Sequence, residues 1–160
     1  MACEANLSGL PLRVLVAEDS DDDAFLLTRA FRKAGIGNPV HVCRDGQETI
    51  DYLSGAEKFQ DRTAYPLPTM LLLDLKMPKV SGFEVLEWLE HHEALRELRA
   101  AVLSSSDHPS DMKRACELGA WFYFVKPATP EGLVEMARQV QENWSSPKPA
   151  YAQPESQAAA

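Results

Sequence analysis

The feature that most constrains the fold is a continuous apolar run, Met70 to Leu73, which ends on an acid in the segment 69–74 (TMLLLD). An alternating apolar and polar pattern would indicate a strand with one face in water. A continuous run indicates a strand that is covered on both faces, as in parallel sheets with helices above and below. The chain is therefore expected to contain a buried parallel sheet.

Short apolar runs of this kind alternate with segments that have helical periodicity. Helix starts are marked by Ser20, by the capping box Ser81 and Glu84, and by Thr129 followed by proline. Strands are predicted at 12–17, 40–43, 69–74, 100–103 and 122–125, and helices at 21–33, 47–53, 81–91, 109–119 and 130–144. Strict alternation of five strands and five helices predicts an α/β fold, a doubly wound five-stranded parallel sheet.

One domain accounts for most of the 160 residues. Residues 1–10 are expected to be an N-terminal extension, 11–144 the folded domain, and 145–160 a disordered tail, because the tail has three prolines and no branched aliphatic residue. The segment 55–68 has no period and two prolines, so it is interpreted as a loop.

Composition disfavours several classes of protein. A net charge of −8 argues against a nucleic-acid binder, since affinity for phosphate backbones comes from Lys and Arg. The chain has no run of 18 apolar residues and no start that resembles a signal peptide. We therefore expect a cytoplasmic protein and not a membrane protein. Three scattered cysteines indicate neither disulfides nor a zinc site, and the four histidines are interpreted as exposed or packed. A protein or a cation is the expected partner.

Polar side chains stand where the predicted strands end. In parallel α/β sheets the ligand site lies at the carboxyl ends of the strands. Four strands deliver polar residues to this edge, namely Glu18, Asp19, Asp74, Ser104 and Lys126. Three carboxylates at about 4 Å would repel by roughly 4 kcal/mol per pair at an effective dielectric of 20, so a cation is expected among them. Mg²⁺ suits a site that also handles phosphate.

Acids in these positions are also found in other classes of protein and at helix starts. Asp21, Asp22 and Asp23 are taken as a solvated helix start. A phosphatase of the haloacid dehalogenase type needs a second Asp two residues after the first, where this chain has Lys76. Acids after the first strand would repel a flavin phosphate, and no Gly-Lys pair is present for a nucleotide-binding P-loop.

Four motifs together resemble the receiver (CheY-like) domain of two-component response regulators. They are VAED ending at Asp19, DLKMPKVSG from Asp74 to Gly82, LSSS around Ser104, and YFVKP ending at Pro127. The resemblance covers about residues 11–144 in the family's order. It implies a flavodoxin-like sheet of order 2-1-3-4-5 and phosphorylation by a sensor histidine kinase.

The resemblance also implies a role for each residue. Asp74 would accept the phosphoryl group, and Lys126 and Ser104 would bind it. Mg²⁺ would be held by Glu18, Asp19, Asp74 and the backbone carbonyl of Lys76. Ser104 and Tyr123 would form the switch that changes the surface of the last two helices and the last strand, through which a homodimer could form. The bond between Lys126 and Pro127 is often cis in the family.

Two positions and one loop depart from the common family pattern. Lys76 stands where a small polar residue is frequent, and Ser106 lies two places after the switch hydroxyl, so both are expected to tune the lifetime of the phosphorylated state. The long segment 55–68 makes the chain similar to stand-alone regulators that pair with phytochrome-type kinases. No enzyme activity is expected beyond its own phosphorylation and dephosphorylation. The alternative is a pseudo-receiver that binds proteins without phosphorylation.

Overall fold

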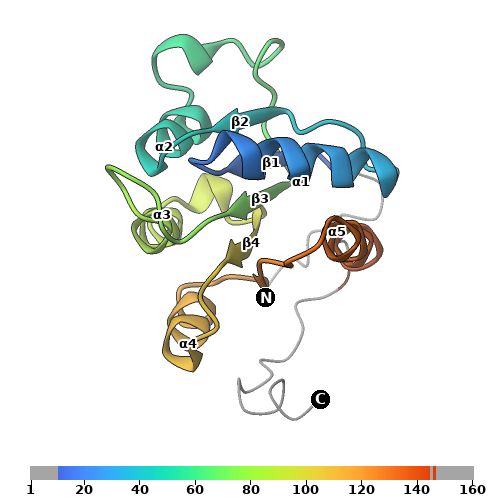
Figure 1. Cartoon of the computed structure of the whole chain (residues 1–160). Coiled ribbons are helices and arrows are strands. Elements are labelled where there is room, and N and C mark those ends of the chain that lie inside the picture. Colours follow the sequence, from blue (N-terminus) through green and yellow to red (C-terminus); the bar gives the residue numbers. More distant parts are fainter. Residues whose placement is uncertain (1–10, 145, 147–160) are drawn as a thin grey trace.

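The computed structural model describes residues 11–144 and 146. Five strands and five α-helices alternate along this part of the chain, with two short 3₁₀ helices between them (Figure 1). The strands are β1 (Val14–Ala17), β2 (His41–Cys43), β3 (Met70–Leu73), β4 (Arg99–Ser104) and β5 (Phe122–Val125). The α-helices are α1 (Asp21–Lys33), α2 (Gly46–Ser54), α3 (Gly82–Glu90), α4 (Pro109–Glu117) and α5 (Pro130–Asn143), and the 3₁₀ helices are η2 (Glu57–Gln60) and η3 (Glu93–Leu95).

The strands form one sheet in the order β2-β1-β3-β4-β5, and every neighbouring pair is parallel. This confirms the predicted doubly wound sheet and its strand order. The central strand β3 has four fully buried residues, as the continuous apolar run requires. In β5, at one edge of the sheet, the residues are partly buried or exposed.

Helices cover both faces of the sheet (Figure 1). On one face, α1 and α5 pack together, and their side chains Phe31 and Val140 join one core cluster. On the other face, α2 and α3 pack side by side, and Tyr52 and Val85 belong to a second cluster. The two faces of each strand contribute to different clusters because successive side chains point to opposite sides. Within residues 11–144, none of the helices combines the length and the apolar composition that crossing a membrane requires.

Local caps fix where the helices begin. The Ser20 side chain accepts from the amide of Asp23, and Thr129 does the same for Gly132. At α3 the capping box is complete, because Ser81 accepts from the amide of Glu84 and the Glu84 carboxylate accepts from the amide of Ser81. Each cap satisfies amides that the helix itself leaves unpaired.

The segment 55–68 was predicted to be a loop without regular structure, and it contains η2. Phe59 from this 3₁₀ helix is 2% exposed and packs in the core. The Arg62 guanidinium donates to the carbonyl oxygens of Tyr52 and Leu53 at the end of α2. Phe59 and Arg62 thus anchor the segment to the core and to the end of α2. The sequence does not indicate this, because a single buried aromatic residue produces no periodic pattern.

The strand β4 begins at Arg99, one residue before the predicted start, and this arginine is buried. Its guanidinium lies 3.8 Å above the ring of Trp121 and donates to the carbonyl oxygens of Trp144 and Ser146. Burial lowers the pKa of this group. The carbonyls that follow the last turn of α5 are therefore satisfied by a charged donor from the sheet. Apart from Ser146, the predicted extension 1–10 and tail 145–160 lie outside the described residues.

Replacing Arg99 with Gln is expected to lower the free energy of unfolding by about 2 kcal/mol, since charged hydrogen bonds of this kind contribute roughly 1.5 to 3 kcal/mol. Chemical denaturation measures the change. Arg96 is exposed and gives the matched control, Arg96→Gln, which should stay close to wild type. Equal stability of the two variants would show that the contacts of Arg99 contribute little.

Candidate functional site

The candidate site lies at the carboxyl ends of the strands, where sheet hydrogen bonding continues one residue beyond β1, β3 and β5. The amide of Glu18 donates to the carbonyl of Cys43, and the amide of Asp74 donates to the carbonyl of Ala17. The amide of Lys126 likewise donates to the carbonyl of Ser104. The backbone of the site is therefore held by the sheet itself, which fixes the points from which these side chains extend.

Three carboxylates meet at this edge. Glu18, Asp19 and Asp74 each place an oxygen within 4.8 Å of the others. The side chains of Glu18 and Asp74 are buried, and Asp19 is exposed. Backbone amides satisfy part of the buried charge, because Ser20 donates to Glu18 Oε1 at 3.1 Å and Lys76 donates to Asp74 Oδ1 at 3.2 Å. This is the cluster that the sequence predicted, and we call it the acid pocket.

Lys126 reaches into the acid pocket from the end of β5. Its Nζ lies 2.9 Å from Glu18 Oε2 and 3.3 Å from Asp74 Oδ2. Burial alone would lower the pKa of Lys126, but the bond to Glu18 and the charge of Asp74 outweigh it, and the pKa is raised. Burial raises the pKa of Glu18, and the nearby Asp74 charge adds to this effect. The ammonium group therefore stays charged and offsets the repulsion between the carboxylates.

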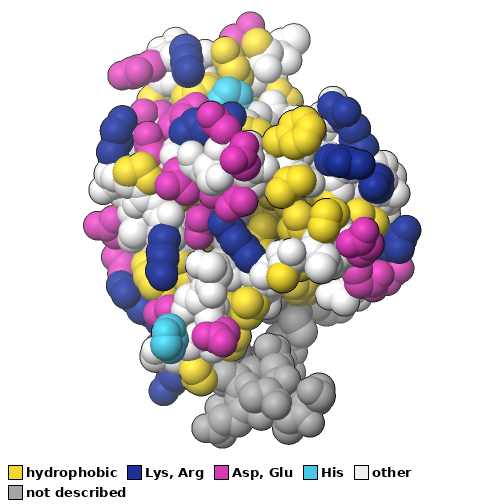
Figure 2. Space-filling view, in the orientation of Figure 1, with side chains coloured by type: hydrophobic (Ala, Val, Ile, Leu, Met, Phe, Trp, Pro, Cys, Tyr) yellow, Lys and Arg dark blue, Asp and Glu magenta, His cyan; other side chains and the backbone are white. Residues whose placement is uncertain are grey.

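Asp23 also contacts the lysine, which the sequence interpretation did not foresee. Its Oδ2 lies 3.1 Å from Lys126 Nζ, and its side chain is about half exposed. Asp21, Asp22 and Asp23 are all consistent with a solvated helix start, so composition alone could not single out the last of them. The phase of α1 turns Asp23 toward the end of β5. In the view of Figure 2, acidic side chains gather on one part of the surface with basic side chains among them, beside a band of hydrophobic ones.

The donor set fits a hard divalent cation. Glu18, Asp19 and Asp74 offer only oxygen ligands, and Mg²⁺ binds through one or two carboxylates while keeping several waters. Asp19 is exposed, so water has access to the third carboxylate. The backbone amide of Lys76 is engaged with Asp74, and the Lys76 side chain is exposed.

The predicted switch residues lie together at the end of β4. The Ser104 side chain is fully buried, and its hydroxyl accepts from the amide of Ser106 at 3.1 Å. The Tyr123 hydroxyl donates to the carbonyl of Ser106 at 2.9 Å, and burial raises the pKa of Tyr123. The Ser106 hydroxyl in turn donates to Asp111 Oδ2 at 2.5 Å. The loop after β4 is thus tied to both β5 and α4.

The structure differs in one detail from what the family resemblance implied. No peptide bond among the described residues is cis, so the bond between Lys126 and Pro127 is trans. The backbone of Lys126 is nevertheless fixed on its amide side by Ser104.

Comparison with known proteins gives a consistent result. The model of the response regulator receiver domain family matches residues 14–138. The structure of response regulator RPA3017, in red light signalling of R. palustris, is 36% identical, with a TM-score of 0.79 over 88% of this chain and 99% of that one.

Two further response regulators are also similar. The structure of the phosphorylated phytochrome response regulator RcpA is 27% identical, with a TM-score of 0.76 over 84% of this chain and 94% of that one. Response regulator Rcp1 from Synechocystis is 27% identical over 137 residues, which cover 86% of this chain and 91% of Rcp1. A structure of the Mn²⁺-bound form of Rcp1 has a TM-score of 0.72 to this chain and covers 88% of it and 100% of that chain.

Proposed function

Because the chain belongs to the response regulator receiver domain family, we propose that it is a single-domain response regulator that accepts a phosphoryl group on Asp74 from a sensor histidine kinase. The observation that carries the proposal is the setting of Asp74. This carboxylate directly follows the central strand β3 and is 6% exposed. It lies next to the partly buried ammonium group of Lys126 and to the carboxylates of Glu18 and Asp19. A nucleophilic carboxylate, a cation site and an ammonium group are the parts that phosphoryl transfer to an acid requires.

The chemistry follows from these positions. An oxygen of Asp74 attacks phosphorus in line, the new O–P bond forms, and the bond between phosphorus and the nitrogen of the kinase histidine breaks. Lys126 is placed to stabilise the negative oxygens of the transferred group, because its Nζ already lies 3.3 Å from Asp74 Oδ2. Mg²⁺ held by Glu18, Asp19, Asp74 and the carbonyl of Lys76 would add positive charge on the same oxygens.

The switch is proposed to run through the loop after β4. A phosphoryl oxygen on Asp74 would draw the Ser104 hydroxyl away from the amide of Ser106, which now donates to it. Tyr123 is bonded to the carbonyl of the same Ser106, so movement of the loop changes the position of the ring. The altered surface would consist of α4, β5 and α5, where a homodimer could form. A phytochrome-type kinase is the proposed donor, by analogy with the phytochrome response regulator RcpA.

Incubation with acetyl phosphate and Mg²⁺, followed by intact-protein mass spectrometry, tests the proposal. The expected result is a mass gain of one phosphoryl group, and no gain when a chelator replaces Mg²⁺ from the start of the incubation. The alternative, a pseudo-receiver that binds a partner without phosphorylation, predicts no mass gain with either acetyl phosphate or a phosphorylated kinase. Absence of any gain under both conditions would favour that alternative.

Lys76 is proposed to slow hydrolysis of the phosphorylated state. It lies two residues after Asp74, its amide is fixed on Asp74 Oδ1, and its exposed ammonium can cover the path of the attacking water. The variant Lys76→Asn should therefore lose phosphate several times faster than wild type at equal Mg²⁺ and low salt. The measurement is the rate of dephosphorylation of purified phosphoprotein. Equal rates would leave Lys76 with a backbone role only. Control of the lifetime would then lie with Ser106, whose hydroxyl donates to Asp111, or with a partner protein.

A further inference from the structure

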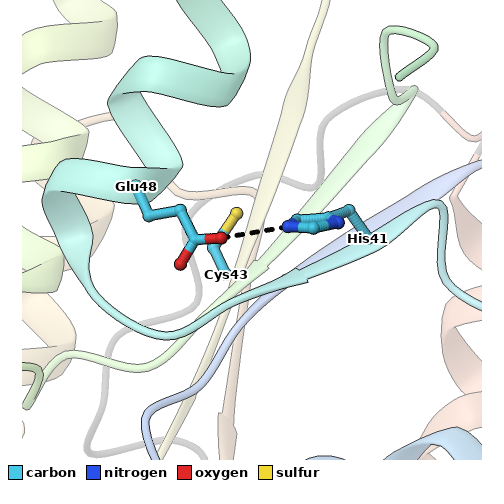
Figure 3. Close-up of side chains that lie close together, drawn as sticks. All are labelled: His41, Cys43 and Glu48. Atoms are coloured by element: carbon cyan, nitrogen blue, oxygen red, sulfur yellow. Dashed lines mark hydrogen bonds and ion pairs between the residues drawn. The ribbon is translucent and has the colours of Figure 1, made fainter. Parts of the chain in front are cut away.

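A second group of metal-ligating side chains lies outside the acid pocket, between β2 and α2. His41, Cys43 and Glu48 place a ring nitrogen, a sulfur and a carboxylate oxygen within 4.8 Å of one another (Figure 3). We propose that this β2–α2 cluster is a binding site for Zn²⁺, with water as the fourth ligand. The sequence indicates no zinc site, because it has no C-x-x-C pair and no histidine was recognised at metal-ligand spacing from a cysteine.

Strand alternation places two of the ligands. His41 and Cys43 are two residues apart in β2, so both side chains stand on the same face of the sheet. Val42 between them is partly buried and packs against the core cluster on the opposite face. Figure 3 shows the Cys43 sulfur and the His41 ring on the side of β2 that α2 covers.

The third ligand comes from the first turn of α2. Asp45 caps this helix by accepting from the amide of Glu48 at 2.7 Å, which fixes the backbone of Glu48. Glu48 Oε2 accepts from the amide of Arg44 at 3.0 Å, and Oε1 lies 3.0 Å from Nε2 of His41. The carboxylate thus points back over β2, where it meets the histidine and the cysteine (Figure 3).

The chemistry of the donors selects the class of metal. The acid pocket offers only oxygen ligands, which suit Mg²⁺, whereas nitrogen and sulfur ligands suit Zn²⁺. One thiolate, one carboxylate and one neutral imidazole balance the two charges of Zn²⁺, so the complete site is neutral, as its partial burial requires. Ligands of tetrahedral Zn²⁺ lie roughly 3.3 to 3.8 Å apart, given Zn–S and Zn–N lengths of about 2.3 and 2.0 Å. The three ligand atoms of the cluster lie within 4.8 Å of one another, so binding requires no pair to approach by more than about 1 Å to reach the longer of these separations.

The cluster is open to solvent on one side and packs against aromatic rings on the other. The side chains of His41 and Glu48 are 26% and 24% exposed, which gives the metal and the water ligand a path, whereas Cys43 is fully buried. The ring of His41 stacks on Tyr52 with 5.4 Å between the ring centroids. It lies nearly perpendicular to the rings of Phe59 and Tyr65, in edge-to-face contacts.

Burial and the charge of Glu48 raise the pKa of the Cys43 thiol. In the structure, Nε2 of His41 lies 3.0 Å from Oε1 of Glu48. On binding, the thiol proton passes to solvent and the metal takes the place of that contact.

The experiment uses Co²⁺ as a spectroscopic substitute for Zn²⁺ in the full chain. A thiolate bound to Co²⁺ gives a charge-transfer band in the near ultraviolet, which oxygen ligands do not give, so the acid pocket does not contribute to this signal. Wild type should show the band at one Co²⁺ per chain, and Zn²⁺ should displace it. Cys43→Val, which keeps an apolar side chain of similar size in the core, should lose the band, and His41→Gln should weaken Co²⁺ binding at least tenfold.

Cys116→Ser is the matched control, because it removes the other described cysteine and should leave the band unchanged. Zn²⁺ should also raise the melting temperature of wild type but not that of Cys43→Val, since a ligand that binds only the folded state stabilises it. A folded wild type with no band, or a band that survives in Cys43→Val, would overturn the proposal.

Discussion

Replacing Asp74 with Asn is expected to abolish phosphorylation while leaving the protein folded. The amide keeps the shape of the carboxylate, but it is not a nucleophile toward phosphorus and carries no charge for a cation. The fold should survive, because Glu18 and Asp74 are two buried acids that repel each other next to Lys126, and the substitution removes one of the two charges. Mass spectrometry after treatment with acetyl phosphate and Mg²⁺ should show no phosphoryl gain.

Asp22→Asn provides the matched control for this loss. Asp22 is exposed in the first turn of α1 and has the same side chain chemistry, so its replacement should leave phosphoryl uptake at the level of wild type. A circular dichroism spectrum equal to that of wild type shows that Asp74→Asn is folded. Retained labelling in Asp74→Asn would place the acceptor on another residue and remove the basis of the proposed function.

The fold could be predicted in detail because its strands are short, apolar and ended by polar residues. The run from Met70 to Leu73 indicated a strand covered on both faces, and the structure confirms its complete burial. Parallel strands bring their carboxyl ends to one edge, so the acids after β1 and β3 and the lysine after β5 were expected to meet. Their contacts in the structure agree with this expectation.

The features that were missed depend on the relative rotation of elements, which a linear pattern does not contain. Asp23 differs from its two neighbours only in its position around α1, and that position brings it to Lys126. Arg99 stands before an apolar run and looks like an exposed residue, yet it is buried against Trp121. Strand alternation puts His41 and Cys43 on one face of β2, but only the packing of α2 places Glu48 close to them.

The start of α3 packs so closely on the end of β3 that it leaves no room for a side chain. A Cβ atom at Gly82 would lie 2.3 Å from the carbonyl oxygen of Asp74 and 2.6 Å from Cα of Leu75, and both are backbone atoms. The amide of Gly82 donates to the carbonyl of Leu75 at 3.0 Å, which ties the helix to this loop. The glycine is therefore required by the close approach of two backbones, one of which carries the proposed acceptor.

Replacing Gly82 with Ala is accordingly expected to lower the free energy of unfolding by about 2 kcal/mol, in the range of roughly 1 to 3 kcal/mol that overpacking of a rigid site costs. The added methyl must also displace the backbone of Asp74 or move α3, so the rate of phosphoryl uptake should fall even in the folded fraction, because a shift of about 1 Å at a reacting group can slow it by 10²-fold. Chemical denaturation and the rate of labelling by acetyl phosphate measure the two effects. Ser110→Ala, an exposed change in the first turn of α4, should alter neither. A Gly82→Ala protein as stable and as quickly labelled as wild type would contradict both expectations. It would show that the loop after β3 can move without a loss of stability and that its packing against α3 does not position Asp74.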